Sequence, residues 1–267
     1  MRVWAPLTLL IAWALLALIS PSLPLVPNQI DLHNILAQPN SEVWLGYDDL
    51  GRSMADRLLI GARTSFFVSV SVVLLTLAIG SVLGVIGGYW GGWMDHVLAR
   101  IMDVFLAFPG ILLAIALAGV LGPGIQNVII ALAAVGWVGY ARLARAQTLS
   151  LKNSDQVLAV KALGANSTRI IKFHLIPMIS APLIIEASYS LAGVVVAEAG
   201  LSFLGLGVQP PTASWGNMIR EGTDYMLVAP HVVIAPGLAL MTVVLAVNLL
   251  GDSLRDWMDV KSNLGRS

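Results

Sequence analysis

The sequence predicts an all-α membrane protein with about six transmembrane helices. Hydrophobic residues make up 57% of the 267 residues and charged residues only 11%, which leaves too little polar surface to cover a soluble domain of this size. Several uncharged runs also exceed the roughly 20 residues that a helix needs to cross a bilayer. The chain has no cysteine, its four histidines lack metal-ligand spacing and its net charge is zero. We therefore expect no disulfide, no metal site and no nucleic-acid partner.

Residues 1–62 are expected to form an N-terminal unit with one transmembrane helix. The apolar run from Val3 to Ile19 is long enough for a short span, and a cleaved signal peptide is the alternative, although no clean Ala-x-Ala site follows it. The next residues are polar and rich in proline, as is typical of a segment outside the membrane. Within that segment, the apolar side chains from Asp48 to Ile60 fall on one helical face, which predicts an interfacial helix.

Residues 63–256 are expected to form a core domain with five further spans, and 257–267 a cytoplasmic tail. The spans are expected at about 66–89, twice within the uncharged stretch 104–141, and at 176–206 and 229–251. A Gly-Gly-Tyr-Trp-Gly-Gly run at 87–92 should end the first of these, and a Gly-Pro-Gly turn at 122–124 should separate the pair. Gly80, Gly84 and Gly88 recur every four residues, which favours close packing against another helix.

The distribution of basic residues predicts the orientation of the chain. Residues 142–172 contain six Lys or Arg and one acid, whereas 21–63 contain three Arg. Short loops rich in Lys and Arg remain on the cytoplasmic side. The loop 142–172 and both termini are therefore expected in the cytoplasm, and the segments 21–63 and 207–228 outside.

A cytoplasmic segment at 148–176 is the candidate functional region. Helix-forming residues run from Asp155 to Leu163, and Gly164 then provides a residue suited to a left-handed helix end. Pro177 stands where the first turn of the next span can accept a proline. The pattern predicts a short helix that ends at a glycine turn and is available to a cytoplasmic partner.

These residues resemble the permeases of binding-protein-dependent ABC importers. The general signature is matched at Ala159, Gly164 and Pro177, with departures at Leu158, Val160, His174 and Ile176. The dipeptide, oligopeptide and nickel permeases are a closer match, with an Ala-Ala-Arg-Ala-Leu-Gly-Ala core. The corresponding residues here are Ala159, Val160, Lys161, Ala162, Leu163, Gly164 and Ala165. Further blocks match in family order at 49–52, 61–63, 169–171, 174–177, 198–211, 214–216 and 248–256. Ser53 departs from the usual Asp, and the arrangement resembles the second permease subunit.

The resemblance implies a type I ABC importer permease in a bacterial or archaeal cell membrane. Such a subunit forms half of a translocation path for peptides, nickel or metal chelates, and pairs with a homologous second permease. Its partners are two cytoplasmic ATPases, on which the segment Ala159–Ala165 docks, an extracytoplasmic solute-binding protein and membrane lipid. The chain lacks a Gly-x-x-x-x-Gly-Lys-Ser/Thr loop, so we expect no ATPase site of its own and no cofactor, with ATP and Mg²⁺ bound by the partners.

Two carboxylates, Glu186 and Glu198, fall inside the apolar stretch of the fifth span. An ionised carboxylate is costly in a bilayer, so both are candidates for the translocation path. For Glu198 the alternative is a structural residue near the outer helix end, bonded to Ser or main-chain groups. The two acids also leave a second function open, a self-sufficient secondary transporter or channel.

Overall fold

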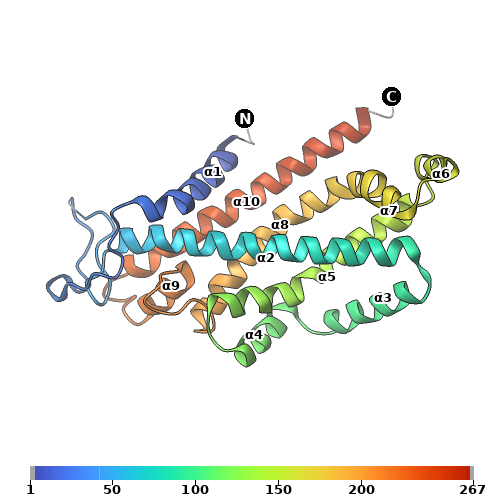
Figure 1. The fold of residues 1–267 in the computed structure, drawn as a ribbon. Helices are drawn as coiled ribbons and strands as arrows, with labels where there is room; N and C mark the ends of the chain where they lie inside the picture. The colour runs from blue at the N-terminus through green and yellow to red at the C-terminus, as the bar shows by residue number, and fades with distance from the viewer. Residues whose placement is uncertain (1–3, 42, 265–267) are drawn as a thin grey trace.

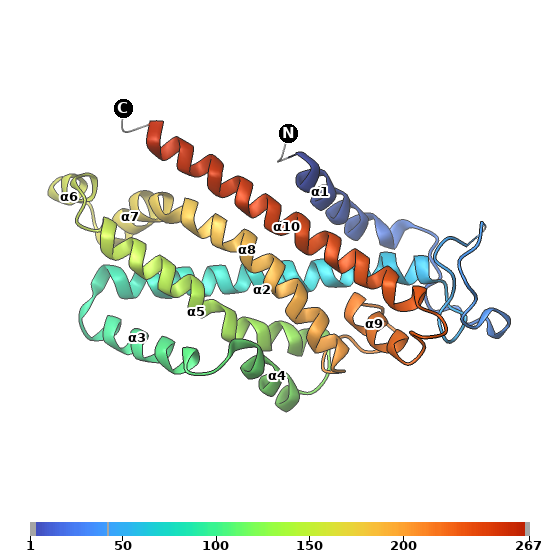
Figure 2. The same ribbon diagram turned by 180° about the vertical axis from the view of Figure 1, so that it is seen from behind.

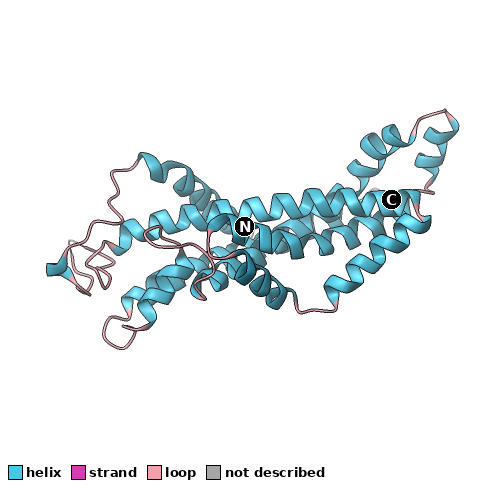
Figure 3. Ribbon diagram, turned by 60° about the horizontal axis from the view of Figure 1, so that its bottom comes forward, coloured by secondary structure: helices cyan, strands magenta, loops and turns pink. Residues whose placement is uncertain are grey.

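The computed structural model describes residues 4–41 and 43–264, with side chains up to Met258. In this part of the chain the fold consists of helices and loops without a strand (Figure 3). The main helices are α1 (Trp4–Ile19), α2 (Met54–Trp90), α3 (Gly92–Leu106), α4 (Gly110–Leu121), α5 (Ile125–Leu151), α6 (Asp155–Ala162), α7 (Ser167–Ile170), α8 (Ile176–Phe203), α9 (Trp215–Thr223) and α10 (His231–Leu264). Of these, five are long and apolar enough to cross a bilayer, and α3 with α4 would make a sixth span.

The long helices α2, α5, α8 and α10 form an elongated bundle (Figure 1). At one end lie α6, α7 and the C-terminal end of α2, which we call the α6 end. At the opposite end lie α9 and residues 20–41 and 43–53, which we call the α9 end. The two ends thus carry different short elements on a common set of long helices.

Helix α2 is continuous from the α9 end to the α6 end. Ser53 begins it by accepting a hydrogen bond from the amide of Asp56 at 3.3 Å, and Gly91 ends it at a φ of 67°. The prediction of a separate interfacial helix at 48–60 is therefore wrong. Residues 48–53 form a turn, and the next residues are the first turns of α2, because no helix-breaking proline follows the Ser53 cap. The expected boundary between residues 62 and 63 falls within this helix.

The third crossing is bent, whereas the sequence predicted an unbroken span from residue 104. Helices α3 and α4 meet at 86°. Pro109 precedes α4 and lacks an N–H group, and its ring disfavours a helical conformation at Phe108. The predicted turn at 122–124 is confirmed, and both of its glycines have positive φ, 85° for Gly122 and 145° for Gly124.

The predicted close approach at Gly80, Gly84 and Gly88 is confirmed, and the partner is α5. A Cβ atom at Gly80 would lie 2.4 Å from the carbonyl oxygen of Trp137, and one at Gly84 would lie 2.3 Å from that of Ala141. Hydrogen in place of a side chain thus allows α2 and α5 to pack main chain against main chain.

Helix α9 lies within the predicted outer loop, and the sequence reasoning missed it. Ser214 caps it, and the Trp215 indole donates to the Leu58 carbonyl at 3.1 Å. Trp13 of α1 stacks on Trp215 at 5.9 Å between ring centroids, so α1, α2 and α9 share one core. Helix α10 continues to Leu264, and the expected boundary at 257 is therefore no break in the helix.

Candidate functional site

Residues 155–165, which we call the α6 segment, comprise α6 and the turn after it. The segment projects from the α6 end of the bundle (Figure 2), and its helix ends just before Gly164, as the sequence predicts. Gly164 has a φ of 84° and its amide donates to the carbonyl of Lys161 at 3.0 Å. The amide of Ala165 donates to the carbonyl of Val160 at 3.2 Å. Together these two bonds form a Schellman ending, which requires a residue that tolerates positive φ. The glycine turn therefore reverses the chain directly after α6.

A small core of its own holds this segment in place. Val157 of α6, Ile170 of α7 and Leu175 are buried against one another, and Tyr89 of α2 packs on the same cluster. Asn166 caps α7 by accepting a hydrogen bond from the amide of Arg169 at 2.9 Å. Burying these apolar side chains fixes α6 relative to the long helices.

The outward side of the segment is apolar and exposed. Leu163, at the glycine turn, is 87% exposed, and Leu158 is 47% exposed. Ala159, Lys161 and Ala162 are also exposed, whereas Val160 and Ala165 are half-buried. Large apolar side chains gathered at the tip of a projecting segment are typical of a protein contact surface.

Polar contacts fix the ends of α2, α3 and α5 beneath α6. Arg145 forms a bidentate ion pair with Asp95, in which its Nη2 atom lies 2.8 Å from Oδ2. Lys152 donates from Nζ to the carbonyl of Gly88 at 2.8 Å. Beyond α7, residues 171–175 form a π-helical turn that leads into α8, with Pro177 in the first turn as predicted. The α6 segment is thus joined to α5 and α8 along the chain and packs on α2 through Tyr89.

The two carboxylates that were candidates for the translocation path, Glu186 and Glu198, lie in different surroundings. Glu198 is fully buried and accepts hydrogen bonds from Ser65 at 3.0 Å and Ser202 at 2.8 Å. These two serine partners agree with the structural alternative for this residue. Glu186 is half-buried and lines a cavity of about 530 Å³ between α5, α8 and α10.

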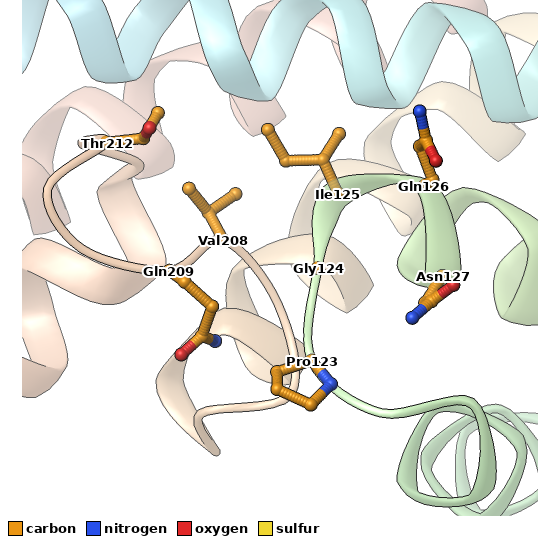
Figure 4. A pocket seen from close by; sticks show the side chains of 8 residues that line it. All are labelled: Pro123, Gly124, Ile125, Gln126, Asn127, Val208, Gln209 and Thr212. Carbon is orange, nitrogen blue, oxygen red and sulfur yellow. The ribbon is translucent and has the colours of Figure 1, made fainter.

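A second pocket, of about 440 Å³, opens at the α9 end between the α4–α5 turn and the loop after α8 (Figure 4). Its lining is Pro123, Gly124, Ile125, Gln126, Asn127, Val208, Gln209 and Thr212. Asn127 and Gln209 both donate from their amide groups to main-chain carbonyls, at distances between 2.9 and 3.0 Å. The lining therefore mixes amide and hydroxyl groups with apolar side chains and includes no charged side chain.

An ion-pair cluster at the α9 end was not predicted from the sequence. Arg57 pairs with Glu221 at 2.7 Å, and Arg52 pairs with Asp48 at 2.7 Å and with Glu221 at 3.0 Å. The carboxylates of Asp48, Asp49 and Glu221 lie within 4.8 Å of one another, a spacing that would suit a metal ion. Arg52 and Arg57 supply two positive charges against these three carboxylates, and the pair between Arg57 and Glu221 joins α2 to α9. Ser53, which departs from the family pattern, caps α2 and takes no part in it.

This geometry defines a multi-span membrane protein with a segment that projects from one end of its helical bundle. The chain belongs to the family described as binding-protein-dependent transport system inner membrane component, whose model matches residues 80–262. It is therefore a multi-pass inner-membrane permease of an ABC importer, and the predicted family and fold are confirmed. The secondary transporter or channel alternative is not favoured.

Two named relatives support this assignment over most of their length. The chain is 42% identical over 234 residues to the glutathione transport system permease protein GsiD of Pectobacterium atrosepticum, covering 88% of this chain and 78% of the relative. It is 42% identical over 228 residues to the dipeptide transport system permease protein DppC of Alkalihalophilus pseudofirmus, covering 85% and 75%. A chain of the inward-facing MetNI methionine ABC transporter has the same fold, with a TM-score of 0.61 at 19% identity, covering 76% of this chain and 97% of that chain.

Proposed function

We propose that this chain forms half of the translocation path of an ATP-driven importer of short peptides. Its other half is a homologous second permease, and cargo arrives from an extracytoplasmic solute-binding protein. The α6 end lies in the cytoplasm, together with both termini. Two relatives are named for glutathione and for dipeptides, which are both short peptides. That shared chemistry favours a peptide cargo over nickel or a metal chelate.

The observation that carries the proposal is the exposed, glycine-ended α6 segment. Leu163 stands at its tip, and the segment is held by its own core and by the π-helical turn before α8. We infer that residues 159–165 dock on one of two cytoplasmic ATPase subunits, which bind ATP and Mg²⁺. Helix α7 and the π-helical turn join these residues to α8, so a displacement of residues 159–165 would be passed to α8 through the main chain. ATP-driven movement of the partner would therefore be transmitted to the helices that line the path.

The glycine turn provides a test of this coupling. Gly164→Val should reduce cargo-stimulated ATP hydrolysis and peptide uptake at least tenfold, because a β-branched residue is strained at a φ of 84°. No atom lies within 4 Å of a Cβ built at Gly164, so the change acts through the main chain alone. Gly164→Asn is the matched control, because Asn tolerates positive φ, and it should retain most of the activity. Both variants are assayed as the complete importer in proteoliposomes. Equal coupling in the two would contradict a role for the turn.

The orientation can be tested separately, because the chain contains no cysteine. Asn153→Cys places a thiol in the exposed turn before α6, and Gln38→Cys places one in the segment before α2. In intact cells, a membrane-impermeant maleimide should label residue 38 and should label residue 153 only after permeabilisation. The reverse pattern would place α6 outside and remove it from the ATPases.

A further inference from the structure

A cavity of about 290 Å³ lies between α2 and the start of α8, at the α6 end of the bundle. Helix α2 lines one side of it, and α7, the π-helical turn and α8 line the other. Valine, isoleucine and leucine make up seven of its eleven lining residues, so its walls are apolar. Two of them, Val82 and Ile176, are 57% and 47% exposed. The cavity therefore opens on the outer surface of this chain rather than into its core.

Apart from the Ser81 hydroxyl, the polar groups of the lining lie at one end of the cavity. Trp90 is the last residue of α2, and Thr168 and Lys172 precede α8, so all three lie at the α6 end. The opposite end lies deeper in the bundle, where Leu183 of α8 is buried. The lining on α2 extends from Ser81 to Trp90, about 14 Å along the helix, which is close to half of a hydrocarbon core of roughly 30 Å. The cavity thus has the depth and the polarity of a single lipid leaflet.

Two basic residues are exposed at the polar end of the cavity. The Lys172 ammonium group lies 5.3 Å from the ring centre of Phe173, which is itself 61% exposed. Arg169 is also exposed and stands three residues earlier in the same helical stretch, where residues at this spacing are neighbours. Neither residue has an ion pair with an acid in the part of the chain that the structure describes. Trp90, 53% exposed, adds an aromatic ring of the kind found at membrane interfaces.

We propose that this cavity binds one anionic phospholipid of the cytoplasmic leaflet. One acyl chain lies between α2 and α8, and the headgroup lies at the surface, where Lys172 and Arg169 donate charge-assisted hydrogen bonds to it. Basic pockets between spanning helices on the cytoplasmic side are suited to anionic headgroups. The bound lipid contacts both α2 and the π-helical turn that joins the α6 segment to α8.

The inference rests on the proposed function for the cytoplasmic position of the α6 end. It goes beyond that function by assigning a specific lipid ligand to the permease, next to the segment proposed to dock on the ATPase.

The test is native mass spectrometry of the complete importer, with both permeases and both ATPases. The importer is released from nanodiscs that contain equal amounts of phosphatidylglycerol and phosphatidylcholine with identical acyl chains. Combined Lys172→Gln and Arg169→Gln should lower the retained phosphatidylglycerol by one molecule per complex and leave phosphatidylcholine unchanged. Val82→Trp, which keeps both charges but fills the cavity, should cause the same loss. Arg100→Gln removes a positive charge from a side chain that is 87% exposed and outside the cavity, so it should retain the wild-type number.

The same spectra show whether all subunits remain assembled, so loss of lipid is distinguished from loss of the complex. Equal retention of phosphatidylglycerol by the wild type and the cavity variants, or an equal loss in Arg100→Gln, would overturn the site.

A photo-crosslinker identifies the occupant directly. Trp90→p-benzoylphenylalanine keeps an aromatic side chain at the rim of the cavity and, in the same nanodiscs, should form an adduct with phosphatidylglycerol. Cross-linking to the second permease instead would show that a protein covers this face, and would overturn the lipid site. The maleimide labelling of residues 38 and 153 tests the orientation independently. A reversed labelling pattern would reject the cytoplasmic leaflet and the proposed function together, whereas the expected pattern without a lipid loss in the variants would reject the site alone.

Discussion

Replacement of Gly84 by leucine is expected to prevent the protein from folding in the membrane. A Cβ atom at this position would lie 2.3 Å from the carbonyl oxygen of Ala141 and 2.9 Å from the Cβ of Ala144. Both obstacles belong to the α5 helix itself, so no flexible side chain can move aside. Overpacking of a well-packed core typically costs about 1–3 kcal/mol, and separating two helix backbones should exceed that range.

Gly84→Ala is the more discriminating variant of this experiment. In an isolated helix the change would stabilise by about 1 kcal/mol, because alanine restricts the unfolded chain. Here the added methyl group should instead destabilise the protein and lower the thermal unfolding temperature of the purified permease in detergent. Gly119→Ala is the control, because a Cβ there meets no atom within 4 Å, and it should not destabilise. Equal behaviour of the two alanine variants would show that α2 and α5 can separate without cost.

The second large effect is expected for Glu221→Gln at the α9 end. The Arg57 side chain is only 2% exposed, and the Glu221 carboxylate lies 2.7 Å from its Nη2 atom. Breaking a buried ion pair by removing one partner costs up to about 3–5 kcal/mol, and Arg57 would keep only its 3.3 Å contact with Asp48, which Arg52 shares. The variant should therefore unfold at a markedly lower temperature, or fail to accumulate in the membrane.

A double substitution identifies the buried charge as the cause. Glu221→Gln combined with Arg57→Met removes both charges, and well-packed apolar replacements of buried ion pairs are often neutral. The double variant should recover most of the lost stability, while Arg52 still pairs with Asp48 at 2.7 Å. Asp224→Asn, at the exposed acid that directly follows α9, should be neutral. A double variant less stable than Glu221→Gln would assign the effect to packing rather than charge.

Features that depend on local chemistry were predictable from the sequence. Gly164 ends α6 because few other residues adopt its φ, and Pro177 stands in a first helical turn that needs no donor. The spans follow from the length of the apolar runs. The glycine repeat in α2 indicated a tight helix contact, but a repeat on one helix does not identify its partner.

Features that depend on distant pairing were not predictable from the sequence. Arg57 and Glu221 are 164 residues apart, and nothing near either residue specifies the other. Helix α9 was missed because it has only nine residues and its apolar face covers another part of the chain rather than lipid. Of the two candidate acids, only tertiary structure shows that Ser65 and Ser202 satisfy Glu198 while Glu186 opens on a cavity.

Because α2 is continuous, it is a rigid connection between the two ends of the bundle. Its 37 residues span about 55 Å, well beyond the roughly 30 Å of a hydrocarbon core. Arg57 holds one end to α9, and Gly88 accepts the Lys152 hydrogen bond near the other. A tilt of about 10° around its centre would displace the two ends by about 5 Å in opposite directions. A displacement of α2 at the α6 end would therefore move its other end, beside α9, in the opposite direction. Alternate opening of the two faces of the membrane requires such opposite movements.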